Sequence, residues 1–305
     1  MKSRNSIFFT VILVFCIVQV TSLSEYLVSG TNPNDKSAFD NSTRKDSGAL
    51  RYAELWQEAQ HLISKGLIKS ALKTVDLILK KAEGEGNSGQ MLKGLFYRFN
   101  YLQRVEEKSL VKIQQELTDR IRVSKAPVRQ LLHSISAEMY WNYYRRNRYR
   151  FLSRSKTSQF KQADMQTWDL KKIVSEVVSH YKHSLTDDQV LKNTGCNIID
   201  PVLERGNRFR RLRPTLYDFL AHRAIDFFSN NEANLTKAVD HFRIDSSKYF
   251  LDNDQFIGFK LKSSDPLSFH YHAIRYLQDL MRFHSRDTDP SAYLDVDFKR
   301  LKFVY

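Results

Sequence analysis

Histidines are the first residues of this sequence whose chemistry could support metal binding or proton transfer. His270 and His272 lie two residues apart, and His284 follows further along the same segment. On a helix, positions i and i+2 point about 200° apart, so this pair cannot bind a metal ion from one face. We interpret these histidines as surface or core-edge residues, and we expect no metal ion and no organic cofactor.

Three acidic residues beside apolar stripes are candidates for buried, catalytically tuned carboxyl groups. They are Glu138, Asp218 and Asp226, and His222 lies one helical turn from the last two. Such an acid is more often the partner of an arginine or of a helix end. The sequence contains no Gly-rich phosphate loop, no HExxH pair and no Gly-x-Ser-x-Gly elbow. The sequence therefore favours a protein that is not an enzyme.

Arginine and aromatic residues interleave in one stretch, a composition typical of a groove on which nucleic-acid bases stack. The aromatic residues are Trp141, Tyr143, Tyr144, Tyr149 and Phe151. The arginines that could bind a polyanion are Arg145, Arg146, Arg148 and Arg150, with Arg208, Arg210 and Arg211 in a second cluster. The alternative is a helix with its aromatic side chains inward and its arginines extended into solvent. Both interpretations stay open on the sequence alone.

Helices must position all of these side chains. Apolar residues recur at i, i+3, i+4 and i+7 from about residue 49 onward, and only 10 Gly and 6 Pro interrupt the 305 residues. This composition argues against a turn-rich β protein. Clear helices are predicted over 109–123 and 167–185, with Thr167 as an N-cap. Asp265 and Asp289, each followed by proline, are predicted to cap the last two helices.

Short links between the helices predict hairpins stacked side by side. Gly66, Ala71 and Val75 half-match the turn and second helix of a tetratricopeptide unit, but no fixed period recurs. The predicted fold is all-α, an irregular tetratricopeptide-like superhelix over residues 49–305. Residues 186–212 could subdivide it. An irregular or β excursion is open near 245–262.

The first residues have the pattern of an export signal. Lys2 and Arg4 precede an apolar run of about 14 residues, which is shorter than the roughly 20 that span a bilayer. Small residues before Leu23 suit cleavage. We predict a signal peptide over 1–22, a flexible tether over 23–48 and no membrane span after cleavage, a retained N-terminal anchor being the alternative.

Net charge and cysteine content restrict the partners. The chain carries a net charge of +14. A basic surface favours acidic partners such as anionic envelope polymers, and export makes nucleic acid the least expected of them. Cleavage of the signal would leave Cys196 as the one cysteine, so no internal disulfide can form, and we expect this thiol to be buried.

Several strings of the sequence are familiar when taken in order. The most specific runs from Arg213 to His222 and contains Arg213, Pro214, Thr215, Tyr217, Asp218 and His222 as a packing or interaction motif. The shorter strings are Leu55-Trp56, Gly66-Leu67, Ala137 to Tyr144, Thr167 to Leu170, Phe283-His284 and Arg300 to Val304. In this order they resemble the N-terminal helical region of bacterial alpha-2-macroglobulin-like proteins of the Bacteroidetes type, and the resemblance covers nearly everything after about residue 50.

This resemblance implies an exported or cell-envelope protein whose relatives trap proteases. In the family, macroglobulin domains follow the helical region, and some members carry a Cys-x-Glu-Gln thioester. Cys196 is followed by Asn197, Ile198 and Ile199, so no thioester is expected here. Helical periodicity runs into Phe303-Val304-Tyr305, which leads us to expect a split or truncated gene product whose partners are downstream macroglobulin domains or another protein.

Two functions follow from these observations. The first is an exported, non-enzymatic helical scaffold or interaction region of an alpha-2-macroglobulin-like protein, located in the periplasm or envelope or secreted. The second is an envelope protein that binds polyanions through its arginine and aromatic clusters, with an affinity that falls as salt rises.

Overall fold

The computed structural model describes residues 47–152, 161, 163–203, 210–230, 242, 244 and 247–305. In these residues the chain is all-α, as the sequence predicts, with helices packed as adjacent pairs and no strand. The predicted signal peptide lies outside them, as does almost all of the predicted tether. None of the helices in this part of the chain combines the length and apolar composition that a bilayer span requires.

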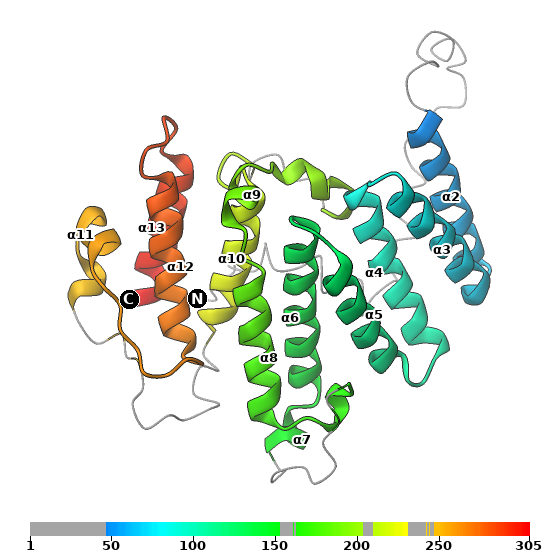
Figure 1. The fold of residues 1–305 in the computed structure, drawn as a ribbon, viewed down its shortest axis with the longest axis horizontal. Coiled ribbons are helices and arrows are strands. Elements are labelled where there is room, and N and C mark those ends of the chain that lie inside the picture. The colour runs from blue at the N-terminus through cyan, green and yellow to red at the C-terminus, as the bar shows by residue number, and fades with distance from the viewer. Residues whose placement is uncertain are drawn as a thin grey trace, which may run out of the picture. The chain divides into compact units, whose positions relative to one another are not determined.

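Two compact units divide the chain, one formed by Met1–Leu110 with Ile198–Glu204 and the other by Val111–Asn197 with Arg205–Tyr305. The described part of the first unit contains α2 (Ser47–Ser64), α3 (Ile68–Gly84) and α4 (Ser88–Val105), and α3 packs against both of the others (Figure 1). Gly66 turns the chain between α2 and α3 with φ +73°, a conformation that glycine adopts without strain. Gly94 allows α4 to approach α3 closely, since an added Cβ would lie 2.8 Å from Leu79.

The second unit is built first around the pair α6 and α8. After α5 (Ser109–Val123), α6 (Val128–Arg146) packs along α8 (Leu170–His183), with α7 (Arg148–Leu152) and η1 (Met165–Thr167) between them in sequence (Figure 1). Aromatic rings fill the contact; Tyr140 and Trp168 have centroids 5.1 Å apart. The short helix α9 (Asp188–Lys192) follows, and then η2 (Cys196–Val202), whose residues from Ile198 onward belong to the first unit.

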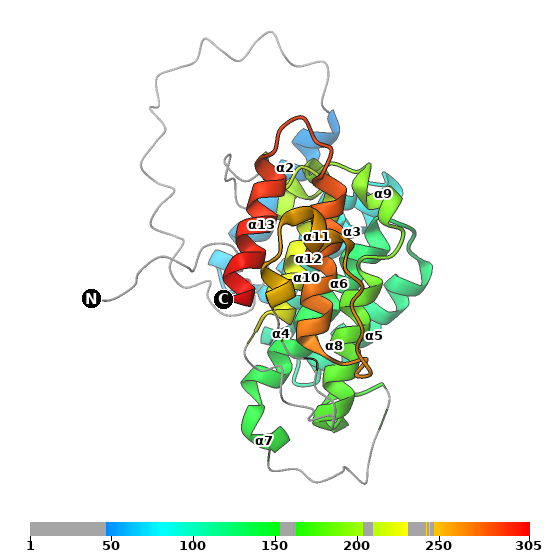
Figure 2. The same ribbon diagram turned by 90° about the vertical axis from the view of Figure 1, so that its left-hand side faces the viewer.

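The remaining helices extend this unit. Helix α12 (Phe269–His284) packs against both α10 (Leu216–Phe228) and α13 (Ser291–Val304), and Figure 2 shows α12 and α13 with α11 beside them. Phe227, Phe228 and Phe269 meet edge to face or tilted, with ring centroids 4.8 to 5.7 Å apart. This buried aromatic cluster fixes α10 against α12.

Residues 247–262 decide between the irregular and the β alternative that the sequence leaves open. The structure forms the short helices η3 (Ser247–Phe250) and α11 (Asn253–Gly258) there, and no strand in these residues. The physical reason is local: Asp252 accepts a hydrogen bond from the Gln255 backbone N–H at 2.9 Å, which caps α11, and Phe256 is fully buried.

Three helix starts also differ from the prediction. Asp169, rather than Thr167, caps α8 by accepting a hydrogen bond from the Lys172 N–H at 2.7 Å. Ser268, rather than Asp265, caps α12. At α13 the N-cap position is Pro290, which has no side-chain cap, although Asp289 accepts a hydrogen bond from the Ser291 N–H at 2.9 Å. At the first two starts a second capping residue lies within three positions of the one that the helix uses.

Candidate functional site

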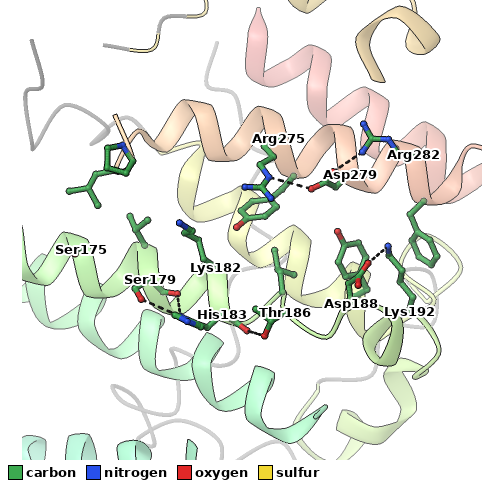
Figure 3. Close-up of a pocket in the computed structure, with 17 residues that line it drawn as sticks. Ser175, Ser179, Lys182, His183, Thr186, Asp188, Lys192, Arg275, Asp279 and Arg282 are labelled. Carbon is green, nitrogen blue, oxygen red and sulfur yellow. Dashed lines mark hydrogen bonds and ion pairs between the residues drawn. The ribbon is translucent and has the colours of Figure 1, made fainter. Parts of the chain in front are cut away.

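A groove lies between α8 and α12 (Figure 3). Its volume is about 940 Å³, which is the size of a site for a small ligand or a short peptide segment. We call it the α8–α12 groove. Its walls include Ser175, Ser179, Lys182 and His183 of α8, Asp188 and Lys192 of α9, and Arg275, Asp279 and Arg282 of α12.

Helical spacing places these polar side chains along the groove. Arg275, Asp279 and Arg282 recur at i, i+4 and i+7, so they share one face of α12. Lys182 extends from the facing side of α8, as Figure 3 shows. The floor is apolar and comes from the buried residues next to these positions: Val178, Tyr217 and Tyr276.

Positive charge exceeds negative charge in the groove. Four cations, Lys182, Lys192, Arg275 and Arg282, face two carboxylates. Asp279 lies 2.8 Å from Arg282 and 3.9 Å from Arg275.

The two ends of the groove differ in how firmly their cations are held. Lys192 pairs with Asp188 at 2.6 Å and lies over the Tyr217 ring at 4.8 Å. Arg282 also donates to the Ile257 carbonyl at 2.9 Å. Lys182 has no carboxylate partner in the described part of the chain, and Arg275 is half exposed. Lys182 and Arg275 are therefore the cations most available to a ligand.

The motif predicted from Arg213 to His222 lies partly behind this groove. Thr215 caps α10 in a reciprocal capping box with Asp218, and Tyr217 reaches the groove wall. Asp218 is fully buried and lies 2.6 Å from His284 Nε2, while His284 Nδ1 lies 2.7 Å from Asp287. Burial alone would lower the pKa of His284, but the hydrogen bonds and charges of Asp218 and Asp287 outweigh it and raise that pKa. His284 therefore bridges two carboxylates, and a carboxylate at each ring nitrogen favours the protonated imidazole.

His222, at the other end of the motif, is held neutral. Burial, followed by the positive charges of Arg213 and Lys299, lowers its pKa well below the ordinary value. Its Nδ1 accepts a hydrogen bond from Lys299 Nζ at 3.2 Å, and Lys299 pairs with Asp226 at 2.6 Å.

None of Asp218, His222 and His284 lines the groove. These groups join α10, α12 and α13, so their evident role is to hold the helices that form the groove. Pro214 precedes this cluster and is exposed, and Arg213 lies 3.9 Å from Asp295.

The remaining candidate acids and histidines have protein partners. Glu138 pairs with Arg223 at 3.3 Å, and His272 Nε2 lies 2.9 Å from the Pro266 carbonyl. No three His, Cys, Asp or Glu side chains within the described ranges are placed to hold a metal ion. Cys196 is buried, as predicted, and its Sγ donates to the Thr215 carbonyl at 2.9 Å.

The predicted arginine cluster lies at the end of α6 and in α7. Arg145, Arg146, Arg148 and Arg150 are all exposed. Among the interleaved aromatic residues, Tyr149 is 88% exposed, whereas Trp141, Tyr143, Tyr144 and Phe151 are buried. Four exposed arginines and one exposed ring thus form a surface that we call the α6–α7 arginine patch.

The second arginine cluster lies before α10. Arg208 lies outside the described residues. Arg210 and Arg211 are exposed, and Arg211 lies 3.4 Å from Asp289.

Two features escaped the sequence analysis. The first is the α8–α12 groove, whose only sequence signal is the charged i, i+4, i+7 row beside the apolar stripe of α12. The second is a contact between His133 of α6 and His180 of α8, whose Nδ1 atoms lie 2.9 Å apart. Neither helix alone indicates that these side chains meet.

Comparisons with known proteins add no name to these observations. No protein-family model, no curated protein and no solved structure matches this chain. The resemblance to alpha-2-macroglobulin-like proteins therefore stays a prediction from the sequence.

Proposed function

We propose that this chain is a non-enzymatic helical interaction protein that binds an acidic segment of a partner protein in the α8–α12 groove. The observation that carries the proposal is the pairing of available cations with an apolar floor. Lys182 and Arg275 project from opposite walls over buried Val178 and Tyr276. A peptide that alternates carboxylates with apolar side chains satisfies both features, whereas a simple inorganic anion would leave the floor uncovered.

The rest of the groove supports a peptide over a reacting substrate. Asp188 and Asp279 already neutralise Lys192 and Arg282. The buried carboxylate and imidazole groups nearby, Asp218, His222 and His284, are engaged with protein partners and lie outside the lining. The groove therefore offers charge and shape for recognition, which agrees with the scaffold role that the sequence favours.

Export and family membership belong to the same proposal. The basic start and short apolar run of residues 1–22 support an exported protein of the periplasm or envelope, or one that is secreted. The ordered strings from Leu55 to Val304 support an alpha-2-macroglobulin-like origin. Under that origin the partner is a downstream macroglobulin domain or another protein.

The finer description of the fold, an irregular tetratricopeptide-like superhelix, is also proposed. Its support is the adjacent packing of α2 with α3 and of α3 with α4, together with the glycine turn at Gly66. Repeat proteins of this kind commonly bind extended peptides on their helical faces.

Fluorescence anisotropy tests the groove directly. The probe is a fluorescein-labelled peptide of repeating Glu-Glu-Leu units, and the same peptide with Gln in place of Glu is the ligand control. Charge reversal by Lys182→Glu with Arg275→Glu is expected to weaken binding about tenfold or more, because two attractive contacts become repulsive. Both residues are exposed or half exposed, so the fold should tolerate the change.

A matched variant separates the groove from net charge. Arg145→Glu with Arg146→Glu changes the net charge by the same amount but lies in the α6–α7 arginine patch. It should leave peptide affinity within about twofold. If both double variants weaken binding equally, attraction to overall charge explains the result and the groove proposal fails.

Binding of a polyanion is the second candidate, and the exposed α6–α7 arginine patch with Tyr149 favours it. The same two variants test it on a heparin column. The Arg145→Glu, Arg146→Glu variant should elute at lower salt than the Lys182→Glu, Arg275→Glu variant. The reverse order would reject the patch as the polyanion site.

A further inference from the structure

Helix α13 presents an apolar stripe that its own unit does not cover. The stripe consists of Leu294, Phe298, Leu301 and Tyr305, which are 57%, 70%, 40% and 103% exposed. The opposite face of the helix is buried through Ala292, Val296, Arg300 and Val304. Both faces are therefore occupied by large or apolar side chains, and only one of them has a partner in the described residues.

The helix cannot rotate to bury this stripe. The guanidinium of Arg300 donates to the Leu251 carbonyl at 2.8 Å and to Asn253 Oδ1 at 3.1 Å, and it lies over the Phe256 ring at 4.5 Å. These contacts fix the face that points toward α11 and η3. The exposed stripe is thus a fixed feature of the unit.

The spacing of the stripe fits a single helix as its partner. Residues 294, 298, 301 and 305 are separated by four, three and four positions, which is the spacing of the apolar seam between two paired helices. A broad, flat partner surface would not require this regularity.

The charges beside the stripe in one copy are complementary to those in a second, antiparallel copy. Asp295 and Lys302 lie seven residues apart, so they flank the same side of the seam at opposite ends. In an antiparallel pairing, the Asp295 end of one helix lies beside the Lys302 end of the other. The Asp295 side chain stays 27% exposed although it also approaches Arg213, and Lys302 is exposed.

We propose that α13 pairs antiparallel with α13 of a second copy of this chain, forming a two-fold dimer through Leu294, Phe298, Leu301 and Tyr305. Large side chains carry about 150–250 Å² each, so the exposed stripe presents on the order of 500 Å² per copy, near the lower limit for a specific dimer. An interface of this size is typical of weak, transient association. It uses a different face from the α8–α12 groove and does not depend on the groove's function.

Sedimentation velocity on the full chain over a wide range of concentration tests the dimer. The wild-type chain should pass from monomer to dimer as concentration rises. Phe298→Glu should remain monomeric throughout, because it places two carboxylates in the seam, and its exposed position should leave the helical circular dichroism unchanged.

Leu77→Glu is the matched control. Leu77 is 58% exposed on α3, so the change replaces an exposed apolar side chain by a carboxylate at a position away from α13. It should dimerise like the wild type, and Lys302→Glu should dimerise more weakly. A wild-type chain that stays monomeric, or a Phe298→Glu variant that dimerises normally, overturns the proposal. A monomeric result would instead leave the stripe for a different protein.

Discussion

Asp218 links two helices of the second unit through its carboxylate. It accepts hydrogen bonds from the Thr215 N–H at 2.9 Å and the Thr215 hydroxyl at 2.7 Å, and it lies 2.6 Å from His284. One buried carboxylate thus caps α10 and ties it to α12. The sequence string that resembles a family motif is, in physical terms, a helix junction.

Asp218→Asn should destabilise the second unit strongly. The amide of this variant cannot accept hydrogen bonds from the Thr215 N–H, the Thr215 hydroxyl and His284 together, and it removes the buried negative charge beside His284. We expect the free energy of unfolding to fall by about 3 kcal/mol. Asp287→Asn should cost less than about 1 kcal/mol, because the Asp287 side chain is 40% exposed and water can replace it.

Urea unfolding measures both variants. In a Trp56→Phe background, the remaining tryptophans, Trp141 and Trp168, both report on the second unit. Equal losses for Asp218→Asn and Asp287→Asn would show that the capping box and its buried hydrogen bonds add nothing beyond the exposed pair.

At the scale of elements, the contact between α6 and α8 depends on two neutral histidines. His133 and His180 share a hydrogen bond at 2.9 Å, which requires one Nδ1 to donate and the other to accept. Burial, and then the neighbouring His180, His183 and Arg129, lowers the pKa of His133 to about 3; burial and then His183 lower that of His180 to about 4. Protonation of either histidine would place an N–H on both Nδ1 atoms, and two donors cannot form a hydrogen bond with each other.

Acid should therefore loosen this helix pair. The unfolded chain binds protons to these histidines below about pH 6.5, whereas the folded chain does not until about pH 4 or lower. The two histidines therefore lower the free energy of unfolding as pH falls from about 6.5 to about 4, and they do not change it above about pH 6.5. His284 has the opposite sign: its raised pKa means that its contribution is lost as pH rises through the folded value.

His133→Asn tests this linkage by urea unfolding at several values between pH 7 and pH 4. The slope of unfolding free energy against pH should fall by about one bound proton relative to the wild type. His61→Asn, at an exposed position of α2, should keep the wild-type slope. An unchanged slope in His133→Asn would mean that His133 is not held neutral by α8.

Element positions were predictable from local signals, and contacts between elements were not. The sequence placed α5 correctly, because apolar periodicity acts within one helix. It missed the cap at Asp169 because Thr167 competes for the same role. The groove forms where Lys182 and Arg275 face each other. These residues are about ninety positions apart in the sequence, so no local pattern predicts that they lie close together.

At the scale of the whole molecule, charge and predicted export have to be considered together. The chain carries +14, and the α8–α12 groove and the α6–α7 arginine patch both contribute exposed cations. An exported protein of this charge meets anionic surfaces before it meets a specific partner. The two surfaces could then divide these tasks, with the patch for general attraction and the groove for recognition.

Expression of the full chain in a secreting bacterial host should yield a product that begins at Leu23. Cleavage there removes the apolar run that would otherwise keep the chain at the membrane. Intact-mass measurement of the extracted protein checks this. A product that keeps residue 1 and stays in the membrane pellet would indicate a retained anchor. The Lys2→Glu, Arg4→Glu variant should be exported more slowly, because it removes the basic start of the signal.

The rate at which the Cys196 thiol is modified reports how often the helix junction opens. It is buried and donates a hydrogen bond to the carbonyl of Thr215, the N-cap residue of α10. A disulfide reagent can reach the sulfur only when this segment opens, so the rate of modification equals the opening equilibrium multiplied by the intrinsic rate of an exposed thiol. The junction's local free energy can thus be measured without any introduced label.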